Sequence, residues 1–232
     1  MNQKAENRPQ KTKKKIKTTV DVLKILCEAV KTTLEEATNS KITYSSTFIK
    51  TGKTCLRPDV GCFVLFGGGF TGLVAMNFSA ESALEIYKKY HLAMGIPEEE
   101  LSVSYVSSEV ADTMGELMNQ SVGKFQRLLK SEFGISVTQN QPKMVSLNQP
   151  MRISLEAEVD RPQYMRVEFR TQDNNLFYLE TTFEKVEFIV VERPQKTHTE
   201  LDIDELIEKK SMKKEEKKQN KVDEEFLKKL GL

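Results

Sequence analysis

Three segments of the chain repeat apolar residues every three or four positions, the spacing that predicts an amphipathic helix. The first spans residues 18–38, and the longest spans 106–134, where Gly134 is a candidate C-cap. A shorter helix follows Ser79, a candidate N-cap, and ends near Gly95. We therefore expect three helices that each bury one side. On the longest helix the predicted buried face consists of Val106, Val110, Met114, Leu117, Ser121, Phe125, Leu128 and Leu129.

The remaining apolar runs are short and rich in β-branched and aromatic residues, which predicts strands. Residues 42–50 form one strand, and residues 61–69 and 71–78 form two more that a glycine cluster joins as a hairpin. After the longest helix the clearest strands are 164–170 and 176–191, separated by a predicted turn. The sequence thus predicts an α+β domain, with an antiparallel sheet and long helices packed against it.

Charged residues concentrate at the two ends of the chain. The net charge of +1 divides into +6 for residues 1–17, −6 for residues 18–192 and +1 for residues 193–232. The first segment is almost free of apolar residues, so we expect a disordered basic arm. The last segment alternates charge signs, as a solvent-exposed helix does, so we expect a charged, partly helical tail. The folded domain is predicted to lie between the two.

Composition excludes several classes of protein. No apolar run approaches the roughly 20 residues of a membrane span, and no apolar stretch follows the basic start as it does in a secretory signal. The three cysteines form no C-x-x-C pair, and with only two histidines they provide no recognisable zinc-binding motif. A Cys–His couple that meets only in space stays open. We expect a cytoplasmic protein without a metal or cofactor of its own.

Two glycine-containing strings resemble nucleotide-binding motifs but lack their requirements. Residues 67–72 match G-x-G-x-x-G, yet the residues that follow predict a strand instead of the helix that a dinucleotide site needs. The string K-T-G-K-T at 50–54 would need glycine at position 47 to complete a P-loop, and Thr47 stands there. Neither string therefore predicts a phosphate-binding loop.

The candidate chemistry lies on the longest helix. Glu109, Asp112, Glu116 and Asn119 follow one another at spacings of three, four and three, so they share one polar stripe opposite the apolar face. A carboxylate beside an amide can bind a cation and orient a water molecule, but it cannot act as a nucleophile. A merely solvated helix face is the alternative interpretation of this stripe.

Two glycines interrupt the same helix. Gly115 and Gly123 each cost about 1 kcal/mol relative to alanine in a helix interior. We therefore expect another backbone to approach the helix closely at these positions.

Residues 109–123, E-V-A-D-T-M-G-E-L-M-N-Q-S-V-G, resemble the signature helix of the CheX/CheC/FliY family of bacterial chemotaxis phosphatases. They are most similar to the CheX pattern E-V-x-D-x-x-G-E-x-x-N-x-x-x-G, whose fixed positions are all met. The order of predicted elements over residues 18–191 also resembles CheX. The resemblance implies a CheX-like fold and a divergent branch of the family, to which the two charged ends are additions.

The resemblance also implies a function and a site. It implies a phosphatase that dephosphorylates the phospho-aspartyl group of a CheY-like receiver domain, in chemotaxis or two-component signalling. The receiver would supply the phospho-aspartate, the Mg²⁺ and a lysine. Glu116 would pair with that lysine, and Asn119 would orient the attacking water. Phosphoryl transfer needs mainly positioning and electrostatics, which such a pair can provide.

The resemblance predicts one site per chain. Family members of the CheC type carry a second E-x-x-N on the first helix, whereas here Glu28 is followed by Lys31 in place of asparagine. Glu36 and Asn39 also fit the spacing, but they lie at the predicted helix end, so we interpret the match as coincidence. CheX-type proteins resemble one another in forming homodimers, which makes a homodimer possible here.

Two other functions stay open. A non-catalytic module would bind a receiver, or a motility or signalling complex, through the same helix or the tail without accelerating phosphate loss. Nucleic-acid binding by the basic arm would show a steep salt dependence that deletion of residues 1–17 abolishes. The acidic charge of the domain argues against nucleic acid as a partner.

Overall fold

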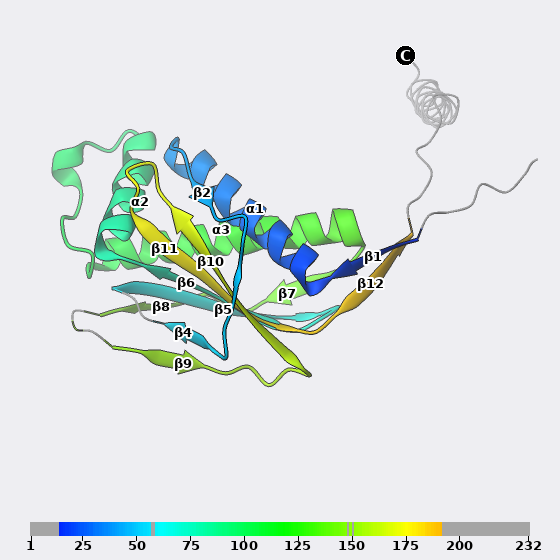
Figure 1. Ribbon diagram of the computed structural model, residues 1–232. Coiled ribbons are helices and arrows are strands. Elements are labelled where there is room, and N and C mark those ends of the chain that lie inside the picture. The colour runs from blue at the N-terminus through cyan, green and yellow to red at the C-terminus, as the bar shows by residue number, and fades with distance from the viewer. Residues whose placement is uncertain (1–13, 57–58, 148, 150, 192–232) are drawn as a thin grey trace, which may run out of the picture. The chain divides into compact units, whose positions relative to one another are not determined.

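The computed structural model describes residues 14–56, 59–147, 149 and 151–191, and within them a compact unit that spans Lys15–Val190. The unit is mixed α+β, as the sequence predicts (Figure 1). None of its helices is both long enough and apolar enough to cross a membrane. The helices are α1 (Thr19–Thr38), α2 (Ala80–Ala93), the short 3-10 helix η1 (Glu98–Glu100) and α3 (Ser108–Phe133).

Local side-chain and backbone chemistry fixes the helix ends. Ser107 Oγ accepts a hydrogen bond from Val110 N at 3.3 Å where α3 begins. Ser79 Oγ accepts one from Ser82 N at 3.2 Å where α2 begins. Helix α3 ends at Phe133, and its C-cap Gly134 has a φ of 70°, the left-handed conformation that glycine adopts without strain. The predicted caps Ser79 and Gly134 are confirmed.

The start of α3 corrects one residue of the predicted buried face. Val106 precedes the N-cap Ser107, so its side chain does not follow the helical periodicity, and it is 44% exposed. Leu128 is partly buried against the core. The other predicted residues are buried: Val110, Met114, Leu117, Ser121, Phe125 and Leu129.

An antiparallel sheet of eight strands forms the centre of the unit. Its order is β2-β10-β11-β6-β5-β7, with β3 also paired to β10 and β8 to β5. The predicted hairpin is β5–β6, in which Val60 lies opposite Phe78. The strands are β2 (Thr43–Tyr44), β3 (Ile49–Lys50), β5 (Val60–Gly68), β6 (Gly72–Phe78), β7 (Val137–Gln139), β8 (Lys143–Ser146), β10 (Pro162–Arg170) and β11 (Leu176–Glu184).

Two of the predicted strands are divided. The segment 42–50 becomes β2 and β3, which both pair with β10, because a bend at Ser46 and Thr47 interrupts the strand. The segment 176–191 becomes β11 and a separate strand, β12 (Glu187–Val191). Strand β12 leaves the main sheet and pairs with β1 (Lys14–Thr18).

The two charged ends lie mostly beyond the described residues. Residues 14–17, which the sequence assigns to the basic arm, belong to β1. The predictions for residues 1–13 and for the tail 193–232 fall on residues that the structure does not describe.

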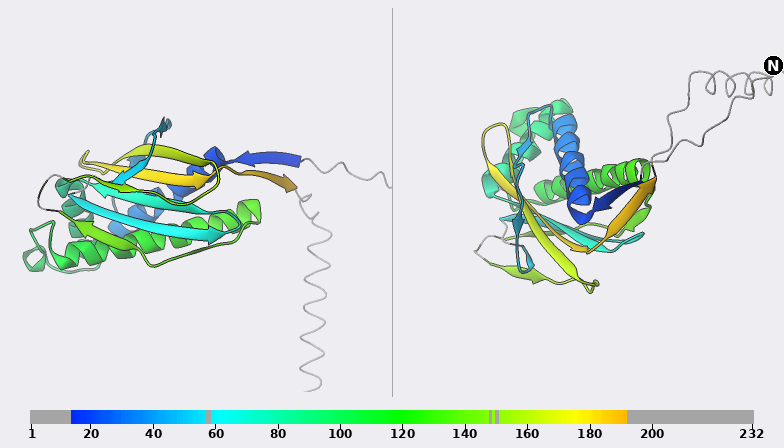
Figure 2. Two further views of the ribbon diagram at one scale, coloured as in Figure 1. Left: turned by 90° about the horizontal axis from the view of Figure 1, so that it is seen from below. Right: turned by 45° about the vertical axis from the view of Figure 1, so that its right-hand side comes forward.

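The three α-helices cover one face of the sheet, as two directions of view show (Figures 1 and 2). Aromatic side chains fill the space between the layers. Phe169 of β10 and Phe177 of β11 stack with ring centroids 5.0 Å apart, and Phe125 of α3 packs edge-on against Phe66 of β5 at 5.8 Å. This packing holds α3 along the sheet and directs its opposite side outward.

The glycine cluster forms the β5–β6 turn and not a nucleotide site. Gly68 adopts a φ of 128°, and a Cβ atom there would lie 2.9 Å from Ser136 O. Gly72 already belongs to β6, where a Cβ atom would overlap the Phe66 ring. The rejection of the dinucleotide motif is confirmed, because a strand and no helix follows the glycines.

A smaller layer covers part of the other face of the sheet. Strands β4 (Thr54–Leu56) and β9 (Ile153–Leu155) pair with each other. Leu56 packs against Leu73 of β6, and the buried carboxylate of Glu180 in β11 accepts a hydrogen bond from Cys55 N at 2.7 Å. The sequence did not predict these two strands, which are only three residues long.

Candidate functional site

The polar stripe predicted on α3 is exposed. Glu109, Asp112, Glu116 and Asn119 all lie on the solvent side of the helix, opposite its buried apolar residues. The sequence therefore predicted the exposed face of this helix correctly. Glu116 and Asn119 are one turn apart, so both side chains are presented from the same rigid surface.

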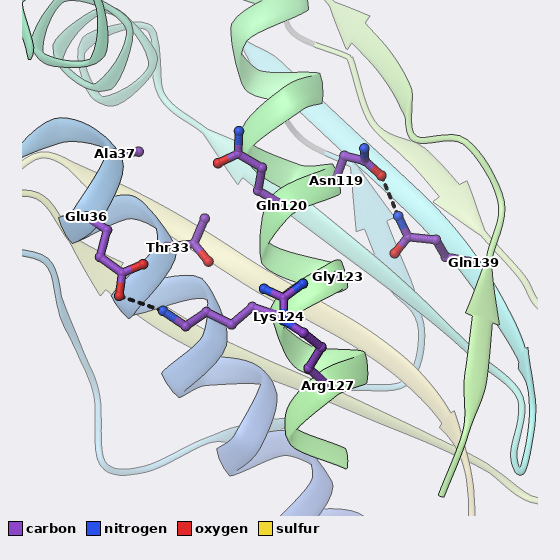
Figure 3. A pocket seen from close by; sticks show the side chains of 9 residues that line it. All are labelled: Thr33, Glu36, Ala37, Asn119, Gln120, Gly123, Lys124, Arg127 and Gln139. Carbon is purple, nitrogen blue, oxygen red and sulfur yellow. Dashed lines mark hydrogen bonds and ion pairs between the residues drawn. The ribbon is translucent and has the colours of Figure 1, made fainter. Parts of the chain in front are cut away.

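Each of the two predicted site residues accepts a hydrogen bond from a glutamine. Gln120 Nε2 donates to Glu116 Oε1 at 2.9 Å from the next turn of the helix. Gln139 Nε2, on β7, donates to Asn119 Oδ1 (Figure 3). Among the described residues, no lysine or arginine forms an ion pair with Glu116. Its carboxylate thus keeps the capacity to bind a cation from outside this part of the chain.

An open cleft of about 540 Å³ lies beside Asn119 (Figure 3). It runs between α1 and α3 and reaches β7, and Glu116 lies just outside its lining. Most of its lining side chains are polar, which suits a polar or charged group better than an apolar one. The lining consists of Thr33, Glu36, Ala37, Asn119, Gln120, Gly123, Lys124, Arg127 and Gln139.

Charged side chains border this cleft on both helices. Lys124 Nζ of α3 and Glu36 Oε1 of α1 form an ion pair at 2.7 Å that links the two helices. Lys124 is only 23% exposed, whereas Glu36 is 72% exposed. Arg127, one turn further along α3, is exposed and has no ion pair with any described residue. The mouth of the cleft therefore offers one unpaired guanidinium group.

The two helix glycines are approached by side chains and not by another backbone, so that expectation was wrong. A Cβ atom at Gly115 would lie 3.4 Å from Met144 Cγ, and one at Gly123 would lie 3.8 Å from Arg127 Nη1. Both are ordinary van der Waals distances. The absence of a side chain at Gly123 instead widens the cleft next to Asn119.

On the first helix, the lysine that stands in place of asparagine lies between two carboxylates of the same helix. Lys31 Nζ lies 4.0 Å from Glu28 Oε1 and 3.9 Å from Glu35 Oε2, so this part of α1 is occupied by its own ion pairs. Asn39 lies beyond the last residue of α1 with a φ of 47°, so it does not share a helical face with Glu36. This geometry differs from that of Glu116 and Asn119, which agrees with the interpretation of Glu36-x-x-Asn39 as coincidence.

Two buried thiols, Cys27 and Cys62, are held in the protonated form by their surroundings. Burial raises the pKa of Cys27 and of Cys62 to about 12, so both stay protonated at neutral pH. His91 Nδ1 lies 2.9 Å from Tyr87 O, one turn back on α2. Within the described ranges, no three His, Cys, Asp or Glu side chains gather closely enough to hold a metal ion.

Sequence reasoning missed the residues that surround the pair. Gln139 and Glu36 come from other elements than α3, and only the packing of β7 and α1 against α3 brings them to the site. Gln120, Lys124 and Arg127 continue the exposed face of α3 in helical spacing, so the same periodicity could have identified them.

Comparison with known proteins identifies a sequence family. The sequence profile of the family described as "Protein of unknown function (DUF3334)" matches residues 13–232, a range that includes both α3 and the charged tail. No curated protein sequence matches the chain.

Solved structures of low sequence identity share the fold. A chemotaxis protein CheX from Desulfovibrio desulfuricans has a TM-score of 0.59 at 18% identity, over 71% of this chain and 99% of that one. A CheC-like superfamily protein from a Shewanella species has a TM-score of 0.59 at 21% identity, over 72% and 99%. CheX in a CheX–CheY–BeF3–Mg²⁺ complex from Borrelia burgdorferi has a TM-score of 0.52 at 16% identity, over 71% and 99%. The CheX-like fold that the α3 motif predicts is therefore confirmed.

Proposed function

This chain belongs to the DUF3334 family, and from this membership, its CheX-like fold and its α3 motif we propose that it dephosphorylates the phospho-aspartyl group of a CheY-like receiver domain. The observation that carries the proposal is the pair formed by Glu116 and Asn119. Both are exposed, one helical turn apart, and Asn119 lines a polar cleft. The process served would be chemotaxis or another two-component signalling pathway.

Glu116 and Asn119 have separate roles in the proposed reaction. Glu116 binds a lysine of the receiver, for which its carboxylate has no competing ion pair among the described residues. Asn119 hydrogen-bonds a water molecule and holds it in line with the phosphorus atom. Such orientation can lower the activation free energy by several kcal/mol. Mg²⁺ would be held by the receiver; the CheX from Borrelia burgdorferi was crystallised with CheY, BeF3 and Mg²⁺.

The bonds change in a single displacement. The water oxygen bonds to phosphorus while the bond from phosphorus to the aspartyl oxygen breaks. The aspartate leaves as a carboxylate, and the released phosphate keeps the protons of the water. Neither Glu116 nor Asn119 forms a covalent bond, which agrees with phosphoryl transfer as a reaction catalysed mainly by positioning and charge.

Phosphate release from receiver domains tests the proposal. Receivers of the host would be phosphorylated with a small-molecule donor, purified from it and mixed with wild type, Asn119→Ala or Glu116→Gln. We expect acceleration by wild type and a loss of at least about 100-fold in each variant, the size typical of a lost transition-state contact. Glu132→Gln, an exposed carboxylate near the end of the same helix, is the matched control and should keep the wild-type rate. A wild-type rate in Asn119→Ala would contradict the proposed role of the amide.

A non-catalytic receiver-binding module is the second candidate. It is favoured by the hydrogen bond that Glu116 already accepts from Gln120 within the same helix. This candidate predicts that wild type and Asn119→Ala bind a phosphorylated receiver equally, and that neither accelerates phosphate release. Calorimetric titration with a receiver held in its BeF3-bound form, beside the release assay, separates the two candidates.

A further inference from the structure

Asn119 is held from a second element of the fold, by Gln139 at the end of β7. The side-chain nitrogen of Gln139 donates a hydrogen bond to Asn119 Oδ1, and both residues line the cleft (Figure 3). We infer that Gln139 is a positioning residue that sets the orientation of the Asn119 amide. The inference rests on the proposed function, because it assigns Gln139 a part in the same reaction.

An exposed asparagine needs such a partner to act as a water-orienting group. The last torsion angle of an asparagine side chain has no sharply preferred value, and the amide presents an acceptor on one side and donors on the other. Without a partner, Asn119 would sample both orientations and several side-chain rotamers in solvent. With one lone pair of Oδ1 engaged by Gln139, the amide keeps its second lone pair and the two Nδ2 hydrogens for a water or a phosphoryl oxygen.

Gln139 is itself held by its strand and by a second side chain of α3. Its backbone lies in register with the buried Phe66 of β5, so the strand pairing anchors it beside α3. Gln126 Nε2 donates to Gln139 Oε1 at 3.3 Å. In this arrangement the Gln139 oxygen faces Gln126 and the Gln139 nitrogen faces Asn119.

The three amides thus form a directed chain of hydrogen bonds between α3 and β7. Gln126 and Asn119 are seven residues apart, two turns along the same side of α3, and Gln139 bridges them. A chain of hydrogen bonds that all point one way polarises each member in the same sense. The direction of the last bond decides whether Asn119 offers its oxygen or its nitrogen to the site.

Substitutions of Gln139 distinguish a role in orienting the Asn119 amide from a role in packing alone. Gln139→Ala removes the restraint on Asn119. Gln139→Glu has nearly the same shape, but a carboxylate only accepts hydrogen bonds, so it would bind Asn119 Nδ2 and turn the amide over. If Gln139 only supported β7, these substitutions would change the stability of the protein and not the rate of the bound reaction.

Single-turnover kinetics with excess protein over phosphorylated receiver provide the first test. We expect the limiting rate to fall about tenfold in Gln139→Ala and at least as far in Gln139→Glu, with half-saturation within about twofold of wild type. Gln126→Ala should lower the limiting rate less. Thr138→Ala, the exposed neighbour on β7, is the matched control and should change neither parameter. Wild-type limiting rates in both Gln139 variants, beside an inactive Asn119→Ala, would overturn the inference and leave the proposed function standing.

A second measurement does not depend on catalysis. The ¹H–¹⁵N heteronuclear NOE of the Asn119 side-chain amide, identified by its loss in Asn119→Ala, reports how rigidly the group is held. We expect a high value in wild type and in Thr138→Ala, and a lower one in Gln139→Ala. Equal values in wild type and Gln139→Ala would overturn the inference. If no receiver is dephosphorylated by wild type, the proposed function fails, and this comparison alone decides whether Gln139 holds Asn119.

Discussion

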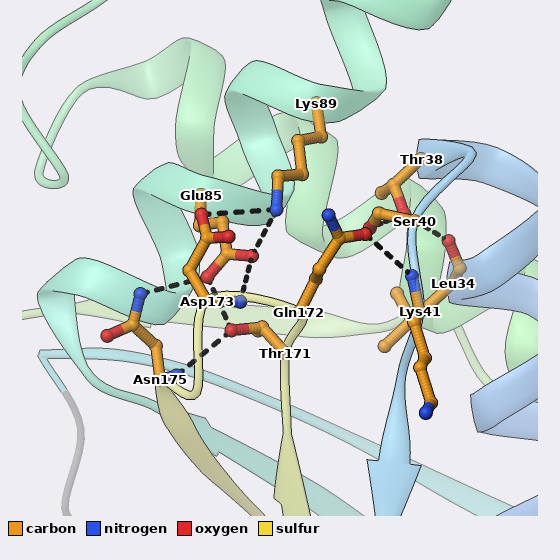
Figure 4. A network of polar contacts seen from close by, with 10 residues as sticks. All are labelled: Leu34, Thr38, Ser40, Lys41, Glu85, Lys89, Thr171, Gln172, Asp173 and Asn175. Atoms are coloured by element: carbon orange, nitrogen blue, oxygen red, sulfur yellow. Dashed lines mark hydrogen bonds and ion pairs between the residues drawn. The ribbon is translucent and has the colours of Figure 1, made fainter.

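Glu85 ties helix α2 to the turn between β10 and β11 (Figure 4). Its buried carboxylate accepts hydrogen bonds from Thr171 Oγ1, from Asn175 Nδ2 at 2.8 Å and from Asp173 N at 3.2 Å. It also forms an ion pair with Lys89 Nζ at 2.6 Å. Burial by itself would raise the pKa of Glu85, but these hydrogen bonds to the charged form outweigh it and lower the pKa below its ordinary value.

The charge on Glu85 therefore stabilises the fold in a pH-dependent way. Glu85→Gln keeps the size of the side chain but removes its charge, so at neutral pH we expect the free energy of unfolding to fall by about 1–3 kcal/mol. Because the folded pKa lies below the ordinary value of 4.5, the stabilisation is complete above pH 4.5 and is lost as the pH falls through the folded pKa.

Urea unfolding of wild type and Glu85→Gln over a pH series measures this difference. The gap between the two proteins should be full near neutral pH and narrow in acid. Glu98→Gln is the matched control, since the exposed pair of Glu98 and Lys88 should contribute less than about 1 kcal/mol. A gap that stays constant from neutral pH to about pH 3 would contradict the role assigned to the charge.

Helix α3 could be predicted because the residues that define it lie close together in the sequence. The apolar period, the Gly134 C-cap and the exposed positions of Glu116 and Asn119 all follow from residues within a few turns. The contact from Gln139 was not predictable, because it joins α3 to a three-residue strand whose place depends on pairing with β5. Strands β4 and β9 were missed for the same reason, since they form through tertiary pairing instead of their own periodicity.

Gly123 lowers the stability of helix α3 but leaves the cleft beside Asn119 wide. Alanine there would meet only Arg127 Nη1, at 3.8 Å, so Gly123→Ala should stabilise the protein by about 0.5–1 kcal/mol. The added methyl group would narrow the cleft beside Asn119. We therefore expect Gly123→Ala to raise the melting temperature and also to raise the receiver concentration for half-maximal phosphate release.

Gly115→Ala separates these two effects, because Gly115 lies on the same helix but outside the cleft lining. It should raise or preserve stability without changing receiver binding, with Met144 as its nearest neighbour. Calorimetric melting and phosphate release measured on both variants test the expectation. Unchanged half-saturation in Gly123→Ala would show that the receiver does not enter the cleft at this position.

At the scale of the whole molecule, the candidate site lies within the unit Lys15–Val190, while the family match extends through residue 232. Composition placed the start of the domain at residue 18, whereas strand β1 begins at Lys14. The distribution of charge along the chain cannot reveal that β1 pairs with β12, because these two strands are far apart in the sequence. An arm deletion that tests nucleic-acid binding should therefore remove residues 1–12 and keep β1.

Deletion of residues 193–232 tests whether the tail contributes to the reaction or to another contact. Glu116 and Asn119 both lie in the unit Lys15–Val190, so the shortened protein should release phosphate from an isolated receiver at the wild-type rate. Urea unfolding, with its slope compared with that of the full chain, serves as the control for folding. A slower reaction with unchanged unfolding would assign the tail a part in receiver binding. An unchanged rate would restrict any contribution of the tail to contacts outside the catalytic step.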